Sequence, residues 1–159
     1  MRTGFIVPSA TFQKVLREEA GLNEYIGLDR HELSAVAALA GSLYEQGRIT
    51  EARAIFEGLI ALDPQLYLGY SGLGAIDLIE ERLDSALANL TRAAGLNPGD
   101  PSVQSNLGEV LLRKARFPEA SRCFEIALEL DPGKVDPGAN RTRAIIGALK
   151  RATKDRTAL

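Results

Sequence analysis

The sequence predicts an all-α protein, a solenoid of three helix-turn-helix repeats, and the main reason is a period of 34 residues. The period is marked by three prolines, Pro64, Pro98 and Pro132, each of which follows a leucine and an aspartate or asparagine. Between the prolines, apolar residues recur at helical rather than strand spacing. Four further sets of residues keep the period: Leu39, Leu73 and Leu107; Ala40, Gly74 and Gly108; Ala52, Ala86 and Ala120; Phe56, Leu90 and Phe124.

The same period predicts the domain organisation. Residues 1–32 form an N-terminal arm that contains a short amphipathic helix at 9–20. The repeats occupy residues 33–134, as 33–66, 67–100 and 101–134. Residues 135–159 follow, with a helix over about 140–154 that has one apolar face (Ile145, Ala148, Leu149 and Ala152) and one basic face. Solenoids need terminal elements with a polar outer side, so we expect this helix to be the C-terminal cap.

Helix boundaries inside a repeat are predicted from capping residues. In the first repeat we expect helices from Leu33 to Gln46 and from Thr50 to Leu62, with a turn at Gly47. Glycine can adopt the left-handed conformation that ends a helix, and threonine can cap the next one. In the second and third repeats we expect Asp84 to cap the second helix and Pro118 to lie in its first turn. A capping box from Asp29 to Glu32 is expected to open the first helix of the first repeat.

Composition and charge narrow the functional classes. The net charge of −2 favours neither nucleic acid nor an anionic membrane as partner, although residues 134–159 carry +5 and the rest of the chain −7. That basic segment fits a solvated helix end, with an acidic-partner site as the alternative. The first residues do not resemble a secretion signal, and no apolar run reaches the roughly 20 residues of a membrane span. We therefore expect a cytoplasmic protein.

Catalytic and metal-binding residues are not indicated. The single cysteine, Cys123, cannot form an internal disulfide and is expected to be a small buried filler. The single histidine, His31, is expected at the surface, and a metal site would need further histidine or cysteine ligands. Arg48, Arg82 and Arg116 recur at the turn between paired helices, where we expect them to interact with the carbonyls that end the first helix. We expect neither an enzyme nor a cofactor.

The repeated positions resemble the tetratricopeptide repeat (TPR) pattern over about 100 residues. Its leucine and small residue appear as Leu39-Ala40, Leu73-Gly74 and Leu107-Gly108, and its alanine, large residue and closing proline recur as given above. The resemblance implies a right-handed TPR superhelix. Its concave wall would be built mainly from the first helix of each repeat.

A narrower resemblance is to the class II chaperones of type III secretion. It is carried by Leu39-Ala40, Tyr44-Glu45-Gln46-Gly47, Ala52, Ile55-Phe56, Leu59 and Leu62-Asp63 in the first repeat, and by Gly72-Leu73-Gly74-Ala75 in the second. This family implies a groove that holds an extended hydrophobic segment of a secreted translocator protein. It also implies a homodimer through the N-terminal helix, here with Phe12, Val15 and Leu16.

The candidate groove is unusually apolar. The helix from Tyr67 to Glu80 is hydrophobic nearly all round and contains two glycines that the repeat does not require, Gly69 and Gly72. Their cost in helix propensity indicates close approach, by the neighbouring helix or by a bound segment. The predicted peptide-binding residues are Ala37, Gly41, Tyr44, Tyr67, Leu68, Ser71, Ala75, Leu78, Ser105 and Leu112.

These observations predict a cytoplasmic TPR chaperone or adaptor that holds a hydrophobic segment of a partner. A clamp for a C-terminal carboxylate is excluded, because Ala37, Gly41, Gly72 and Ser102 stand where its polar residues are needed and only Asn106 is polar. Three alternatives for the groove and the protein remain. In the first, flanking helices or a dimer partner cover the groove. In the second, the protein is a generic scaffold that binds partners through its convex face. In the third, it is a permanent subunit of a secretion complex.

Overall fold

The structure is a computed structural model that describes residues 27–156, with side chains up to residue 152. Within these residues the chain forms helices and no strand, so the predicted all-α class is confirmed. The predicted N-terminal helix with Phe12, Val15 and Leu16 lies outside the described residues. Two compact units divide the chain between Gly72 and Leu73, which is inside one helix.

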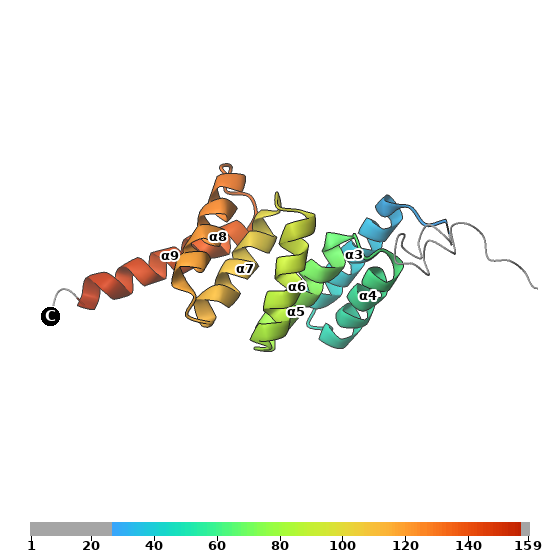
Figure 1. The fold of residues 1–159 in the computed structure, drawn as a ribbon, viewed down its shortest axis with the longest axis horizontal. Coiled ribbons are helices and arrows are strands. Elements are labelled where there is room, and N and C mark those ends of the chain that lie inside the picture. Colours follow the sequence, from blue (N-terminus) through green and yellow to red (C-terminus); the bar gives the residue numbers. More distant parts are fainter. Residues whose placement is uncertain (1–26, 157–159) are drawn as a thin grey trace, which may run out of the picture. The chain divides into compact units, whose positions relative to one another are not determined.

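The first unit contains α3 (Arg30–Glu45), α4 (Ile49–Leu62) and the beginning of α5 (Tyr67–Ile79). Helices α3 and α4 pack side by side as a hairpin (Figure 1). The predicted capping box starts α3: the backbone N–H of Glu32 donates to Asp29 Oδ1 at 2.8 Å, and that of Asp29 donates to Glu32 Oε2 at 2.9 Å. The core of the hairpin is built from Leu33, Ala37, Ala40, Leu43, Ala52, Phe56 and Leu59.

The second unit contains the rest of α5, α6 (Leu83–Leu96), α7 (Pro101–Arg113), α8 (Phe117–Leu130) and α9 (Pro137–Arg156). Helix α7 packs on α6, α8 and α9. The small repeated residues have the expected role, because a Cβ at Gly74 would lie 2.5 Å from Leu90 Cγ and one at Gly108 would lie 2.6 Å from the Phe124 ring. Small residues thus let each helix pair approach closely.

The turn between the two helices of a repeat has the same geometry three times. The second residue after the first helix is left-handed, with φ of 77° at Gly47 and 58° at Glu81 and Ala115. The next backbone N–H then returns to the ending helix: Arg48 N donates to Leu43 O at 2.9 Å, and Arg82 and Arg116 repeat the bond. The left-handed role predicted for Gly47 is therefore confirmed.

The predicted caps of the second helices are wrong at two positions. Thr50 and Asp84 lie inside the first turns of α4 and α6, and the N-cap residues are Arg48 and Arg82, whose side chains make no capping bond. The turn itself sets the backbone there, so the helix begins earlier than side-chain preferences suggest. Pro118 does lie in the first turn of α8, as predicted.

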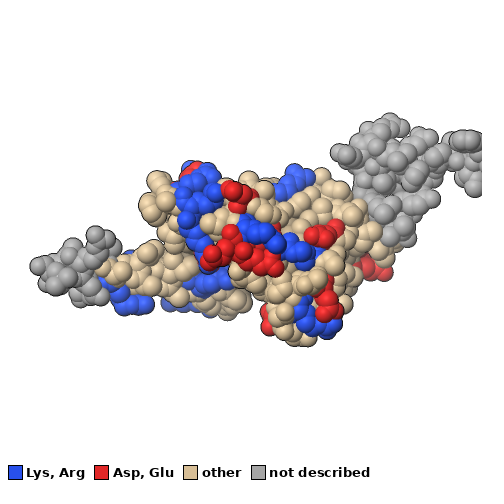
Figure 2. All heavy atoms as spheres, turned by 90° about the horizontal axis from the view of Figure 1, so that it is seen from below, with Lys and Arg blue, Asp and Glu red and all other residues tan. Residues whose placement is uncertain are grey.

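Helix α9 is longer than expected and only its first part is anchored. Ala139 and Thr142 are fully buried, while Ala148, Leu149 and Ala152 of the predicted apolar face are exposed. Among the basic residues, Arg141 bonds to Asn106, and Arg143 bonds to Asp131 at 2.8 Å. On the face shown in Figure 2, the charged side chains along α9 are lysine and arginine.

Candidate peptide-binding surface

In the first unit, five of the six predicted groove residues are accessible. Gly41 and Tyr44 of α3 are half-buried, and so are Tyr67, Leu68 and Ser71 of α5. A Cβ built at Gly41 would meet no atom of residues 27–156 within 4 Å, so these residues leave open space above this part of α3. Ala37 is the exception: it is 5 % exposed and belongs to the core.

In the second unit, two predicted groove residues are core residues. Leu78 is 2 % exposed and packs in one cluster with Leu90 and Val110. Ser105 is also 2 % exposed, and its hydroxyl pairs with that of Thr142 on α9 at 2.7 Å. Both assignments to an open wall are therefore corrected. A helix that is apolar nearly all round does not reveal from its sequence which side is covered.

Two predicted groove residues of the second unit remain accessible. Ala75 of α5 and Leu112 of α7 are half-buried. Leu112 lines a cleft of about 350 Å³ together with residues of α8 and α9. The sequence pattern does not predict this cleft. The apolar face expected for the last helix does not include Ile146, which lines the cleft.

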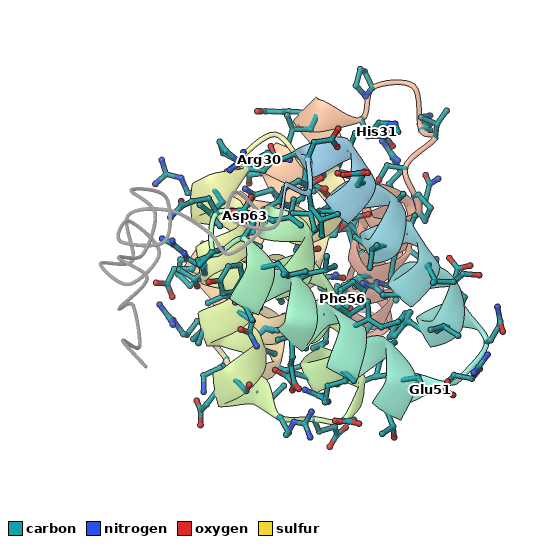
Figure 3. All side chains as sticks on the ribbon, turned by 90° about the vertical axis from the view of Figure 1, so that its right-hand side faces the viewer. Arg30, His31, Glu51, Phe56 and Asp63 are labelled. Atoms are coloured by element: carbon teal, nitrogen blue, oxygen red, sulfur yellow. The ribbon has the colours of Figure 1, made fainter. Side chains whose placement is uncertain are left out.

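The glycines at 69 and 72 are explained by packing against α4. A Cβ at Gly69 would lie 2.7 Å from Ile60 Cγ1, and one at Gly72 would lie 2.3 Å from the ring of Phe56. Figure 3 shows Phe56 pointing from α4 into the interior of the unit. The neighbouring helix, one of the two causes considered, therefore accounts for both glycines, and they do not indicate a ligand site.

The three repeated arginines bind the helix-ending carbonyls through their backbone N–H groups, as expected, while their side chains form ion pairs. Arg48 pairs with Glu51, and Arg116 pairs with Glu119, three residues later in each case. These hydrogen bonds lower the pKa of the carboxyl groups of Glu51 and Glu119. The carbonyls are satisfied by backbone N–H groups of the turn, so the arginine side chains remain available to stabilise the start of the second helix.

The second repeat has a different polar arrangement at this turn. Asp77 is 1 % exposed, at a position where the other repeats have the buried leucines Leu43 and Leu111. Its carboxylate accepts from Arg82 at 2.7 Å, from Ser85 Oγ at 2.5 Å and from Asn89 Nδ2 at 2.9 Å. The buried charge is thus paired and hydrogen-bonded, which indicates a structural network rather than a catalytic group.

A salt bridge joins the two ends of the first hairpin. Arg30 Nε lies 3.1 Å from Asp63 Oδ2, and the Asp63 side chain is 6 % exposed (Figure 3). Asp63 Oδ1 also accepts from the backbone N–H of Gln65 at 2.8 Å. Oδ1 thus accepts a hydrogen bond, while Oδ2 has the ion pair with Arg30 but accepts no hydrogen bond, and Asp63 stabilises the turn after α4. The nearby His31 is exposed, as predicted.

Reactive groups are few in the described part of the chain. Cys123 is half-buried beside the cluster of Leu111, Ala120 and Phe124. Burial raises the pKa of the Cys123 thiol above its usual value, and the negative charge of Glu119 adds to the shift. Among the described residues no group of three or more His, Cys, Asp or Glu side chains could hold a metal ion.

The described helices include no membrane-spanning segment. None of them is both long enough and apolar enough to cross a bilayer. The basic residues of α9 are one reason, because they interrupt the longest helix at 141, 143, 150 and 151.

The geometry described so far defines an α-helical repeat protein with an accessible, largely apolar surface on the first helix of its first hairpin. Models of the tetratricopeptide repeat match residues 13–67 and 77–144. The chain therefore belongs to the tetratricopeptide repeat proteins.

The curated relatives match this chain over only a small part of their own length. The chain is 34 % identical over 70 residues to the tetratricopeptide repeat domain-containing protein PYG7 of Arabidopsis thaliana, a match that covers 44 % of this chain and 23 % of that protein. It is 31 % identical over 107 residues to the protein O-mannosyl-transferase TMTC1 of Mus musculus, covering 65 % of this chain and 11 % of that one. The match thus spans less than a quarter of either relative.

Solved structures with similar folds are more nearly the same length. The type III secretion translocator chaperone SycD of Yersinia enterocolitica superposes with a TM-score of 0.64 at 23 % identity, over 80 % of this chain and 97 % of SycD. A chain of a type III secretion complex from Aeromonas hydrophila gives 0.70 at 21 % identity, over 90 % and 97 %. PcrH, solved with the chaperone binding region of PopB, gives 0.61 at 25 % identity, over 74 % and 97 %. This chain is similar to these chaperones in fold.

Proposed function

We propose that this protein is a non-enzymatic adaptor with chaperone activity in the cytoplasm, where it holds an extended apolar segment of another protein against α3 and the start of α5. The observation that carries the proposal is the open space above Gly41, where an added Cβ would meet no atom of the described part of the chain within 4 Å. Half-buried Tyr44 lies one helical turn further along α3. A side chain of the bound segment can enter this space and lose its contact with water there.

The similar structures support the proposal. One is SycD in complex with a peptide of the translocator YopD, at 23 % identity and a TM-score of 0.62. PcrH was likewise solved with a segment of PopB. A translocator of type III secretion is accordingly the class of partner that we propose. Burial of apolar area at about 25 cal/mol per Å² would drive binding, opposed by the entropy of ordering the segment.

Two matched glycine variants test the proposal. Gly41 and Gly58 both lie inside helices and both have open space around an added Cβ, so leucine at either site should leave the fold intact. Gly41 is on α3, in the proposed surface, whereas Gly58 is on α4. The probe is a fluorescein-labelled extended peptide with apolar residues at alternate positions, measured by fluorescence anisotropy beside the YopD peptide and an all-polar control.

We expect Gly41→Leu to weaken binding of the apolar peptide at least tenfold, which corresponds to about 1.4 kcal/mol. Gly58→Leu should bind as the unchanged protein does. Equal affinities of the two variants would contradict the proposal, and so would equal binding of the apolar and all-polar peptides. Circular dichroism of both variants serves as the control for folding.

A further inference from the structure

The cleft in the second unit is apolar and open. It is lined by Leu112, Phe117, Ala120, Ser121, Phe124, Glu125, Ile146 and Leu149, and its volume is about 350 Å³. Two of its apolar side chains are largely in water: Phe117 is 60 % exposed and Leu149 is 46 % exposed. The volume lies at the lower end of the range typical of ligand-binding pockets.

The equivalent place one repeat earlier is filled. Moving each lining residue back by 34 positions gives Leu78, Leu83, Ala86, Leu87, Leu90, Thr91, Leu112 and Ala115. There, Leu78, Ala86, Leu90 and Val110 form a buried cluster against which Leu83 and Leu87 also pack. The TPR fold therefore closes this site when a complete set of side chains is present.

Two polar contacts hold the filled site closed. Arg113 NH1 donates to the carbonyl oxygen of Leu78 at 3.4 Å, and Lys114 Nζ donates to Asp84 Oδ1 at 2.5 Å. Both contacts join the end of α7 to the preceding hairpin. At the open cleft the positions equivalent to Arg113, Lys114 and Asp84 are Gly147, Ala148 and Pro118.

The apolar wall also loses volume at α9. The position equivalent to buried Val110 is Ala144, which is exposed. Together with Gly147 and Ala148, this substitution leaves α9 without the side chains that cover the site in the earlier repeat. The openness of the cleft thus follows from particular residues of this chain and is not a general property of the repeat.

Charge around the cleft indicates the kind of occupant. The charged side chains around the cleft are unevenly distributed. Helix α9 carries the exposed Lys150 and Arg151 next to Leu149, whereas α8 carries Arg122 together with the exposed Glu119, Glu125 and Glu129. Glu125 is the one acidic residue of the lining, and it already accepts from Ser121 Oγ at 3.1 Å. Residues 134–159 as a whole carry an excess of basic over acidic side chains. The α9 side of the cleft therefore favours negative charge.

We propose that this cleft is a second protein-docking site, which takes one or two apolar side chains of a partner segment flanked by acidic residues. The site is distinct from the surface around Gly41 and Tyr44. Leu112, which the sequence placed in the groove, belongs to this cleft in the proposal.

Fluorescence anisotropy with a short labelled peptide tests the proposal. The peptide has a central leucine-phenylalanine pair flanked by aspartates and glutamates, and a matched peptide replaces the acidic residues by asparagine and glutamine. The variants are Phe117→Gln and Leu149→Gln in the cleft, with Ile79→Gln as the control, since Ile79 is 50 % exposed on α5 and does not line the cleft. All three positions are exposed enough for glutamine to be tolerated.

We expect saturable binding of the acidic peptide, at least tenfold weaker with either cleft variant and unchanged with Ile79→Gln and Gly41→Leu. Binding should also weaken with the neutral peptide, with Arg151→Gln and in high salt, because salt screens exposed charges. No binding of the acidic peptide, or equal loss with Ile79→Gln, would overturn the proposal. Loss of a homodimer with Phe117→Gln in sedimentation would overturn it as well, because a second copy would then fill the cleft.

Discussion

Phe56 and Gly72 show how closely α4 and α5 approach. A Cβ at residue 72 would lie 2.3 Å from the Phe56 ring, so alanine there forces the ring to move. We expect Gly72→Ala to destabilise the protein by about 1–3 kcal/mol through overpacking, less the roughly 1 kcal/mol that alanine gains in helix propensity. Gly58→Ala, with open space around its Cβ, should instead stabilise by about 0.5–1 kcal/mol.

Urea denaturation of the two alanine variants measures these effects. If Gly72→Ala is as stable as Gly58→Ala, the close approach of α4 and α5 is wrong. Phe56→Leu in the Gly72→Ala background is a further control, because the smaller side chain should remove the clash.

Asp77 stands where the other repeats have a core leucine. The residues that bind its side chain also differ from those at the same positions of the other repeats. Ser85 and Asn89, which donate to its carboxylate, stand where the other repeats have glutamate and an apolar residue or cysteine. We expect Asp77→Leu alone to cost about 1–3 kcal/mol, because both donors lose their acceptor. Adding Ser85→Glu and Asn89→Ile should recover most of this loss, since the triple variant restores the arrangement of the first repeat.

Thermal unfolding of the single and triple variants checks this coupling. Additive losses in the triple variant would show that the three residues do not act as one network.

At the scale of elements, the helix ends determine much of the local stability. The turn after α7 places Ala115 at a φ of 58°, a conformation that costs an L-residue roughly 1 kcal/mol or more. Ala115→Gly should therefore stabilise the protein by about 1 kcal/mol, whereas Gly47→Ala, at a φ of 77°, should destabilise it by a similar amount. Opposite shifts of the denaturation midpoint are expected, and shifts of the same sign would contradict the assigned turn.

The contact of α9 with the end of α8 depends on pH. The hydrogen bond from Arg143 holds the pKa of Asp131 below its usual value, aided by backbone N–H groups such as that of Val135. A depressed folded-state pKa gives stability that is complete above the unfolded value of about 3.9 and is lost as pH falls through the lower folded value. The free energy of unfolding should therefore fall less between pH 5 and pH 2 in Asp131→Asn than in the unchanged protein. An unchanged pH profile would show that the pair contributes nothing.

Sequence patterns predicted some helix boundaries better than others. The capping box at Asp29 and the proline at 118 were identified correctly because the side chain itself makes or spares a hydrogen bond. Thr50 and Asp84 were misassigned because the backbone of the preceding turn, rather than a side chain, starts α4 and α6. A pattern of residue types does not contain that geometry.

At the scale of the whole molecule, the repeat predicted the fold but not every exposed surface. The period of 34 residues was sufficient for the hairpins and their small contact residues. Burial of Leu78 and Ser105 depends on neighbours from α7 and α9, which the repeat alone does not specify. The open cleft has the same origin, because Gly147 and Ala148 lack the side chains of their counterparts one repeat earlier.

The central claim is that an extended apolar segment binds on α3 and the start of α5. The most direct test is a titration of the ¹⁵N-labelled protein with the apolar peptide, followed by amide chemical shifts. We predict that the shifted amides concentrate around Gly41, Tyr44, Leu68 and Ser71, while that of Gly58 on α4 stays unchanged. Shifts confined to α4, or no shifts at saturating peptide, would contradict the claim.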